Sequence, residues 1–223
     1  MNKFAIIVAG GSGTRMGSNI PKQFLPLDGM PILMHSLTAF HAFDAEMQLI
    51  LVLPSFQVSY WEKLCEKHHF KLAHRIVAGG NSRFQSVRNG LESIAEKEGI
   101  VFIHDGVRPL ISLETIKNCY LTATEKGNAL PVVPLVDSIR ELTDGQSTHK
   151  DRANYRLVQT PQTFLLAEIK AAFQQKECPL FTDDASVLEA AGGKINLVDG
   201  NSENIKITTP KDLALAEILI KQK

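Results

Sequence analysis

Short apolar runs alternate with amphipathic segments along most of this chain. A continuous run such as Leu49-Ile50-Leu51-Val52-Leu53 is typical of a strand buried on both faces of a sheet. Strand and helix patterns in alternation predict an α/β fold, with a mostly parallel sheet covered by helices. The strands expected are residues 4–8, Gln48–Leu53, Ala73–Val77, Val101–His104, Ala129–Pro134, Ile195–Val198 and Ile205–Thr208.

Helix starts are marked by proline and by capping residues. Pro31 stands at the first position of a helix expected over residues 31–40. Ser82 and Gln85 form a capping-box pattern ahead of an apolar face that contains Phe84, Val87, Leu91 and Ile94. Thr209-Pro210 with Asp212 starts a last helix, Leu213 to Ile220.

One segment departs from this alternation. Residues 137–162 are mostly polar, and Asp144-Gly145 is a turn signal within them. A stretch of this length without its own core is either a mobile lid or a hairpin arm that packs against a second subunit. We therefore predict one domain over residues 1–223, with an arm at about 137–160.

Charge balance and cysteine content limit the classes of partner and the compartment that fit this protein. Lys plus Arg and Asp plus Glu balance at 24 each, so no long-range field favours nucleic acid or an anionic membrane. Three scattered cysteines lack metal-ligand spacing and are typical of buried thiols in a reducing cytosol. No apolar run has the length of a membrane span, and a strand begins too early for a signal peptide. The expectation is a soluble, cytoplasmic protein.

The most specific motif follows the first strand. Ala9-Gly10-Gly11-Ser12-Gly13-Thr14-Arg15-Met16-Gly17 is rich in glycine, and Pro21-Lys22-Gln23-Phe24 comes soon after. Glycines let backbone N–H groups turn toward a phosphate, although glycine-rich turns without a ligand are also common. The loop is neither a Walker A loop nor a dinucleotide fingerprint. With Arg15 and Lys22 on either side, it indicates a nucleoside triphosphate site, where fixed cations stabilise charge on the α-phosphate.

Two further loops follow predicted strands. In Gly79-Gly80-Asn81-Ser82-Arg83-Phe84-Gln85-Ser86, Ser82 is expected as a helix N-cap. Ser86 lies opposite the apolar stripe and is expected to be free to contact a base or ribose. In His104-Asp105-Gly106-Val107-Arg108, Asp105 can bind a sugar hydroxyl or help to hold Mg²⁺, and Arg108 can hold a phosphate; a plain surface ion pair is the alternative.

Polar residues near the carboxyl terminus complete the candidate set. Thr182 stands where a helix N-cap is expected, with Asp183 and Asp184 in the favourable first turn. Lys206 lies between Ile205 and Ile207 on an expected apolar strand. A cation there requires an anionic partner, and a substrate phosphate is a reasonable one.

Together these motifs closely resemble the 2-C-methyl-D-erythritol 4-phosphate cytidylyltransferase family from residue 5 to about 216. The resemblance implies a Rossmann-like fold with a protruding β-arm, a homodimer, and transfer of CMP from CTP to the acceptor phosphate. It also implies Mg²⁺, bound mainly through the CTP phosphates, and partners limited to CTP and a small polyol phosphate.

The same resemblance assigns roles to residues. Arg15 and Lys22 match cations that stabilise the pentacoordinate phosphorus, and we group Lys206 with them as catalytic. Positions that match the cytidine site are Ala9, Gly10, Gly11, Gly80, Asn81 and Ser86. Positions that match the acceptor pocket are Asp105, Arg108, Ser138, Arg152, Thr160, Thr182 and Lys206, with Ser138 and Arg152 reaching it from the partner's arm.

The chain departs from the family at a few positions. Gly10 stands where alanine is frequent, Gly106-Val107 replaces two small residues, and Ser138 replaces a threonine while keeping the hydroxyl. No departure removes a required charge. Ribitol-5-phosphate cytidylyltransferase is the nearest alternative, and the residues around Ser138, Arg152 and Thr182 favour methylerythritol phosphate over it. A nucleotide-binding module without catalysis predicts loss of Arg15, Lys22 or Lys206, and all three are present.

Overall fold

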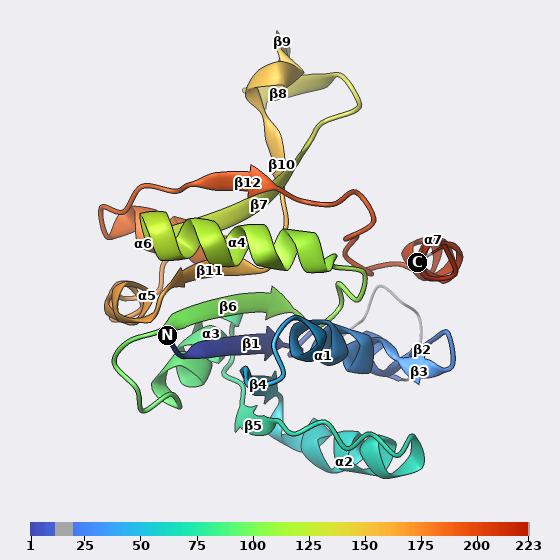
Figure 1. Cartoon of the computed structure of the whole chain (residues 1–223). Coiled ribbons are helices and arrows are strands. Elements are labelled where there is room, and N and C mark those ends of the chain that lie inside the picture. The colour runs from blue at the N-terminus through green and yellow to red at the C-terminus, as the bar shows by residue number, and fades with distance from the viewer. Residues whose placement is uncertain (12–19, 223) are drawn as a thin grey trace.

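A central sheet organises the molecule. The computed structural model describes residues 1–11 and 20–222. Seven strands follow the order β10-β7-β11-β6-β1-β4-β5, and an eighth, β12, also pairs with β7 (Figure 1). Their bounds are β1 Lys3–Val8, β4 Gln48–Leu53, β5 Arg75–Ala78, β6 Ile100–Asp105, β7 Asn128–Pro134, β10 Arg156–Val158, β11 Gln162–Leu165 and β12 Leu197–Asp199. The predicted α/β class is confirmed.

The sheet is parallel at its centre and antiparallel where β11 enters it. β1 pairs in parallel with β4 and β6, and β4 pairs in parallel with β5. β11 runs antiparallel between β6 and β7. The sequence interpretation missed β11, because its Gln162 and Thr163 are polar. Both side chains are nevertheless buried, so the apolar-run criterion fails there.

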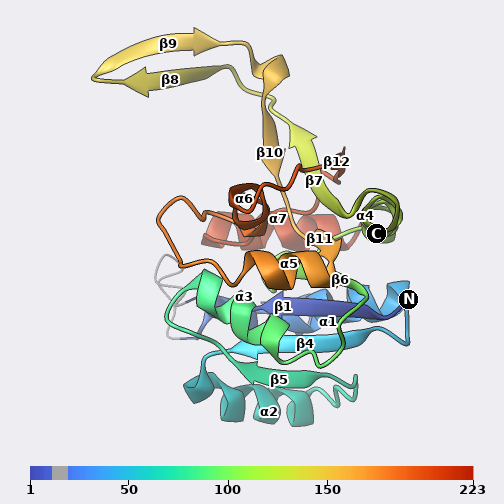
Figure 2. The ribbon, with the colours of Figure 1, turned by 90° about the vertical axis from the view of Figure 1, so that its left-hand side faces the viewer.

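Helices cover both faces of the sheet, and each face has its own core. Alternate strand residues divide accordingly: Ile7 and Leu51 face one core, whereas Ile6 and Ile50 face the other. Figure 2 shows the second face toward the viewer. The first face carries α1 (Ile32–Phe43), α2 (Val58–Lys67) and α4 (Leu113–Lys126), and the second carries α3 (Arg83–Glu92), α5 (Leu166–Ala172) and α6 (Asp184–Ala190).

A smaller core lies beside the sheet, where the last helix packs. Ala216 of α7 (Pro210–Ile220) packs with Leu27, Ile32 and Ile207. The remaining elements are short: η2 (Lys22–Phe24), β2 (Pro26–Leu27), β3 (Met30–Pro31) and η3 (Ser55–Gln57). Among the described helices, none is both long and apolar enough to cross a bilayer.

Helix starts follow the sequence with three corrections. Pro31 is the N-cap of α1 and not its first residue. Thr209 and Asp212 form the expected capping box of α7. Ser82 caps α3, but the Gln85 amide oxygen accepts the N–H of Asn81 instead of returning to Ser82. The N-cap of α6 is Asp183, one residue after the expected Thr182, because the Asp183 carboxylate forms a capping box with Ser186.

The polar segment 137–162 forms a β-arm that projects beyond the sheet (Figure 2). It contains β8 (Ile139–Thr143), β9 (Gln146–Lys150) and η4 (Arg152–Asn154), and it returns through β10. Asp144 and Gly145 form the turn with φ values of 51° and 76°, the left-handed backbone that a two-residue hairpin turn requires. The turn signal was therefore read correctly.

The predicted strand Ile205–Thr208 is wrong. These residues join no sheet, and the Ile207 N–H donates to the Val107 carbonyl at 2.9 Å. The apolar alternation instead serves the smaller core, which Ile205 and Ile207 enter together. Two other expected strands, Ala73–Val77 and Ile195–Val198, form one or two residues later, as β5 and β12.

Candidate active site

A pocket of about 260 Å³ opens at the carboxyl ends of β1 and β6, where parallel sheets place their ligands. It brings together most of the residues singled out in the sequence. The predicted residues in its lining are Ala9, Gly10, Gly11, Lys22, Gly80, Asn81, Ser86, Asp105 and Lys206. The lining also contains Val8, Gln23, Ser82, Arg83 and Val107, which were not predicted as site residues.

Backbone close approach shapes the glycine-rich wall of the pocket. A Cβ on Gly80 would lie 2.4 Å from the Cβ of Gln85, so only glycine fits there. The Gly80 N–H donates to the Ser86 hydroxyl at 3.1 Å, and that hydroxyl donates to the Ser82 carbonyl at 2.8 Å. Ser86 is therefore buried, contrary to its expected freedom, because the Gly79-Gly80 loop folds over the start of α3.

Lys22 lines the same pocket beside the glycine-rich wall. It begins η2 and its residue is only 9% exposed. The neighbouring Gln23 amide donates to the Ala9 carbonyl at 2.9 Å and to Gln57 Oε1 at 2.7 Å, which ties η2 to the end of β1. The backbone that carries Lys22 is thus fixed. Arg15, the other predicted catalytic cation of this loop, lies outside the described residues.

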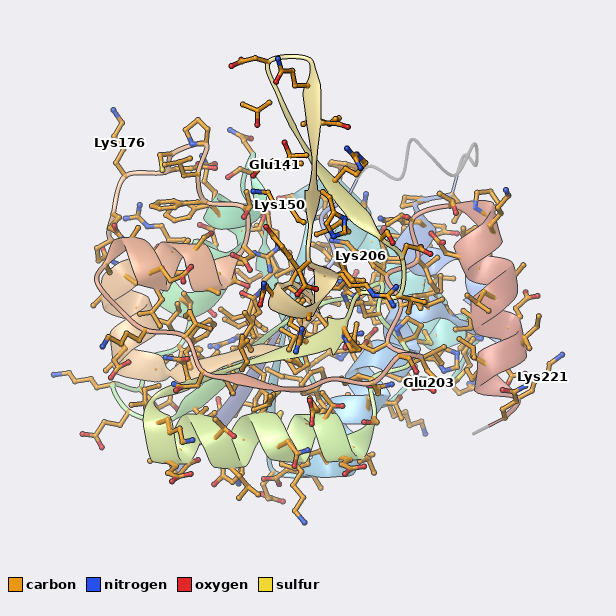
Figure 3. The ribbon with its side chains drawn as sticks, turned by 90° about the horizontal axis from the view of Figure 1, so that it is seen from above. Glu141, Lys150, Lys176, Glu203, Lys206 and Lys221 are labelled. Carbon is orange, nitrogen blue, oxygen red and sulfur yellow. The ribbon has the colours of Figure 1, made fainter. Side chains whose placement is uncertain are left out.

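Asp105 is the centre of a charge cluster at the end of β6. Its Oδ2 lies 2.8 Å from Lys206 Nζ and 3.7 Å from Arg108 Nε, and its Oδ1 lies 3.6 Å from Arg83 Nε. Figure 3 shows Lys206 in the central part of the view, whereas Glu141 and Lys150 belong to the arm. The sequence indicated that Lys206 needs an anionic partner. Within the chain, that partner is Asp105.

This cluster sets the protonation state of Asp105. Burial by itself would raise the pKa of the carboxyl, but the charges of Arg83, Lys206 and Arg108 outweigh it and hold that pKa below its ordinary range. Asp105 is therefore a stable carboxylate at neutral pH. The three cations and one anion leave a net positive charge on this side of the pocket, which suits a phosphate ligand.

Arg83 and Asp184 form an ion pair that the sequence interpretation missed. Arg83 Nη1 and Nη2 donate to the two carboxylate oxygens of Asp184 at 2.7 and 2.6 Å. Asp184 is fully buried, and its charge raises the pKa of Arg83 although burial acts in the opposite direction. The sequence offered one signal for this role: Arg83 is a cation directly after the N-cap of α3 and close to Gly79-Gly80.

A buried chain of hydrogen bonds lies behind Asp105. The ring of His104 meets the Arg108 carbonyl through Nε2 at 3.0 Å and the Thr160 hydroxyl through Nδ1 at 3.0 Å. A carbonyl can only accept, so Nε2 carries the proton and Nδ1 accepts from Thr160. The Thr160 oxygen in turn accepts the Asp105 N–H at 3.1 Å. Thr160 thus supports the backbone of Asp105 from behind.

The remaining residues predicted for the acceptor pocket do not line this pocket in the part of the chain that the structure describes. Arg108 borders the cluster, and its Nη1 donates to the Asn204 carbonyl at 2.8 Å. Thr182 precedes the N-cap of α6. Ser138 and Arg152 belong to the arm, where the Arg152 guanidinium donates to the Val136 carbonyl. One chain by itself therefore does not bring the arm residues to this pocket.

We expect acid to destabilise the fold through His104. Burial lowers the pKa of this ring from 6.5 to about 4, so the unfolded chain binds the proton first. The stabilisation present above pH 6.5 is lost as pH falls toward 4, by up to about 3 kcal/mol. The measurement is urea unfolding of wild type and His104→Gln at pH 7, 6, 5 and 4, with exposed His41→Gln as control. The stability advantage of wild type over His104→Gln should shrink with acid, and an advantage that stays constant would contradict the assignment.

A family comparison covers nearly the whole chain. The model of the IspD family, described as 2-C-methyl-D-erythritol 4-phosphate cytidylyltransferase, matches residues 4–222. A curated protein of that name from Phocaeicola vulgatus is 53% identical over 220 residues, which cover 99% of this chain and 100% of the relative. One from Geobacter metallireducens is 40% identical and covers 100% of this chain and 99% of the relative.

Solved structures with the same fold agree with the sequence relatives. The crystal structure of 4-diphosphocytidyl-2C-methyl-D-erythritol synthase from Anaerococcus prevotii superposes with a TM-score of 0.83 at 25% identity, covering 99% of this chain and 98% of that one. The 2-C-methyl-D-erythritol 4-phosphate cytidylyltransferase structure from Thermus thermophilus gives a TM-score of 0.78 at 29% identity, covering 99% and 100%.

Proposed function

The chain belongs to the 2-C-methyl-D-erythritol 4-phosphate cytidylyltransferase family, and on that premise we propose how its pocket works. CMP is transferred from CTP to the phosphate of 2-C-methyl-D-erythritol 4-phosphate, and pyrophosphate is released. The observation that carries this proposal is the meeting of a glycine-lined wall with Lys22, Lys206 and the Asp105 cluster in one pocket. The glycine wall suits a nucleotide, and the cations suit phosphates.

The chemistry requires charge stabilisation more than proton transfer. An oxygen of the acceptor phosphate attacks the α-phosphorus, a new P–O bond forms, and the bond to the bridging oxygen of the β-phosphate breaks. A phosphate monoester is already largely ionised near pH 7, so no general base is needed. We assign Lys22, together with Arg15, to the charge that develops on the α-phosphate, and Lys206 to the acceptor phosphate.

We propose Mg²⁺ as the metal of this reaction, held mainly by the CTP phosphates. Asp105 is the one carboxylate in the described pocket lining, and it already contacts three cations. This donor set fits an ion that keeps waters and triphosphate oxygens as ligands, with Asp105 nearest in the chain. It does not fit an ion caged by protein carboxylates. When bound, the ion neutralises charge on the triphosphate.

Acceptor choice is tested by pyrophosphate release with CTP and Mg²⁺. Methylerythritol 4-phosphate and ribitol 5-phosphate are compared as acceptors at matched concentrations. Strong preference for methylerythritol phosphate supports the proposal. Preference for ribitol phosphate would keep the fold and the chemistry but move the enzyme to polyol activation. Turnover with neither would favour a non-catalytic nucleotide-binding module.

We also propose a homodimer in which the arm of one subunit completes the pocket of the other. Support comes from the arm's position away from its own sheet and from apolar side chains left exposed on and beside it. Val136 and Leu142 are 81% and 77% exposed, and a second subunit would cover this apolar surface. We place the enzyme in the cytoplasm, because its three cysteines are free thiols.

If each active site is shared between two subunits, two variants that are defective alone should regain activity when they form a heterodimer. Arg152→Ala should weaken acceptor binding and leave CTP affinity intact, whereas Lys22→Ala should disable chemistry. In a purified heterodimer, the intact pocket of one subunit receives the intact arm of the other, so about half of wild-type activity should return. The measurement is turnover of the doubly tagged, co-expressed pair, with each homodimer as control. No rescue, or a fully active monomer, would contradict the arm proposal.

A further inference from the structure

Arg83 lies between two carboxylates that are far apart in the sequence. As the first residue of α3, it lines the active-site pocket. Both of its terminal nitrogens donate to Asp184, at 2.7 and 2.6 Å, and its Nε lies 3.6 Å from Asp105 Oδ1. A guanidinium held at both terminal nitrogens has a fixed plane, and the direction of its Nε–H is fixed with it.

The two oxygens of Asp105 have different partners. Oδ1 faces Arg83, whereas Oδ2 faces Lys206 at 2.8 Å and Arg108 at 3.7 Å. The rotation of this carboxylate therefore decides where the Lys206 ammonium is held. Arg83 lies on the side opposite Lys206, so its charge favours the rotation in which Oδ1 faces Arg83 and Oδ2 faces Lys206.

Asp184 occupies one edge of the Arg83 guanidinium. The carboxylate of Asp184 is fully buried and takes both terminal nitrogens. It balances the charge of Arg83 and leaves Lys206 as the more exposed cation at Asp105, with 42% of its side chain accessible against 31% for Arg83. The Arg83–Asp184 pair therefore adds no net charge to the pocket, and its guanidinium lies next to Asp105.

We propose that Arg83, anchored by Asp184, is a positioning residue for the transfer reaction: it orients Asp105, which in turn holds Lys206 where the acceptor phosphate binds. This inference rests on the proposed function and deepens it. It assigns a role to the half-buried Arg83 and the fully buried Asp184, which act on the acceptor side of the site. Loss of the pair should therefore raise KM for the acceptor more than KM for CTP.

The test replaces the whole pair, because removal of one partner leaves an uncompensated buried charge. Arg83→Met combined with Asp184→Leu exchanges the ion pair for apolar side chains of similar size, an exchange that is often neutral for stability. We expect the melting temperature to stay close to wild type, while kcat/KM for methylerythritol phosphate falls about 10- to 100-fold. KM for CTP should change by less than about threefold.

A matched pair on the same helix provides the control. Arg88 and Glu92 form an exposed ion pair of 2.9 Å on α3. Arg88→Met combined with Glu92→Leu makes the same chemical change away from the pocket and should leave both KM values unchanged.

Each outcome decides the inference. An acceptor-selective loss in the Arg83 and Asp184 double variant, with no loss in the Arg88 and Glu92 control, supports it. Unchanged kinetics, or equal losses with both substrates that follow the melting temperature, would overturn it and leave Arg83 a structural residue. If the double variant does not fold, Arg83→Lys replaces it, because lysine keeps the charge but lacks the fork; the same acceptor-selective loss is then required. An inactive wild type would instead refute the proposed function.

Discussion

Replacing Lys22 by alanine is expected to lower kcat by about 10²–10³, the effect of removing one group that stabilises transition-state charge. Lys22 is almost fully buried, and its backbone is fixed through Gln23 and Gln57. Because its ammonium is placed before the reaction, its contact with the α-phosphate should strengthen as charge develops there. The loss should therefore appear in kcat and much less in KM for CTP.

The measurement is steady-state pyrophosphate release by Lys22→Ala and by Lys63→Ala, a lysine of α2 outside the pocket. Lys63→Ala should match wild type. Turnover of Lys22→Ala within about threefold of wild type would refute the assigned role of this lysine. A parallel loss in thermal stability would indicate that the change acts through folding, so melting temperatures are compared first.

Lys206→Met is expected to lower kcat/KM for the acceptor by about 10²-fold or more, with the nucleotide side less affected. Methionine keeps most of the aliphatic stem and removes the ammonium that lies 2.8 Å from Asp105. The positive charge that faces the acceptor phosphate is lost, and Asp105 loses its closest cation. Both changes disfavour an anion at this position, and the pKa of Asp105 should rise.

Lys211→Met, on the exposed side of α7, is the matched control for this variant. Acceptor saturation curves at fixed CTP, followed by CTP curves at saturating acceptor, separate the two effects. A rise in KM for CTP alone would show that Lys206 binds the triphosphate and not the acceptor. An unchanged kcat/KM would remove Lys206 from the site.

The fold was predictable where strands are continuously apolar. The run over β4 gave its bounds correctly, and the Asp144-Gly145 signal located the turn of the arm. The same criterion failed for β11, whose Gln162 is buried but satisfied: its side chain donates to Asp183 and accepts the N–H of Ala185. It also failed for Ile205–Thr208, where apolar residues serve packing against a helix and not pairing in a sheet.

The candidate site was predictable where function needs the backbone. Gly80 is required by a close approach to Gln85, and such positions leave a visible motif. Arg83 and Asp184 left none, because they are 101 residues apart and each resembles an ordinary helix-start residue. His104 is similar: its partner Thr160 is 56 residues away and comes near because β11 lies beside β6, which one sequence does not display.

The most direct test of the central claim, cytidylyl transfer at this pocket, follows the phosphorus nuclei of CTP and methylerythritol 4-phosphate by ³¹P NMR during turnover. Two mutually coupled diphosphate signals of the product and the pyrophosphate signal should grow at equal rates, while the acceptor monophosphate signal declines with CTP. Growth of inorganic phosphate or CMP with an unchanged acceptor signal, or a spectrum that does not change, would contradict it.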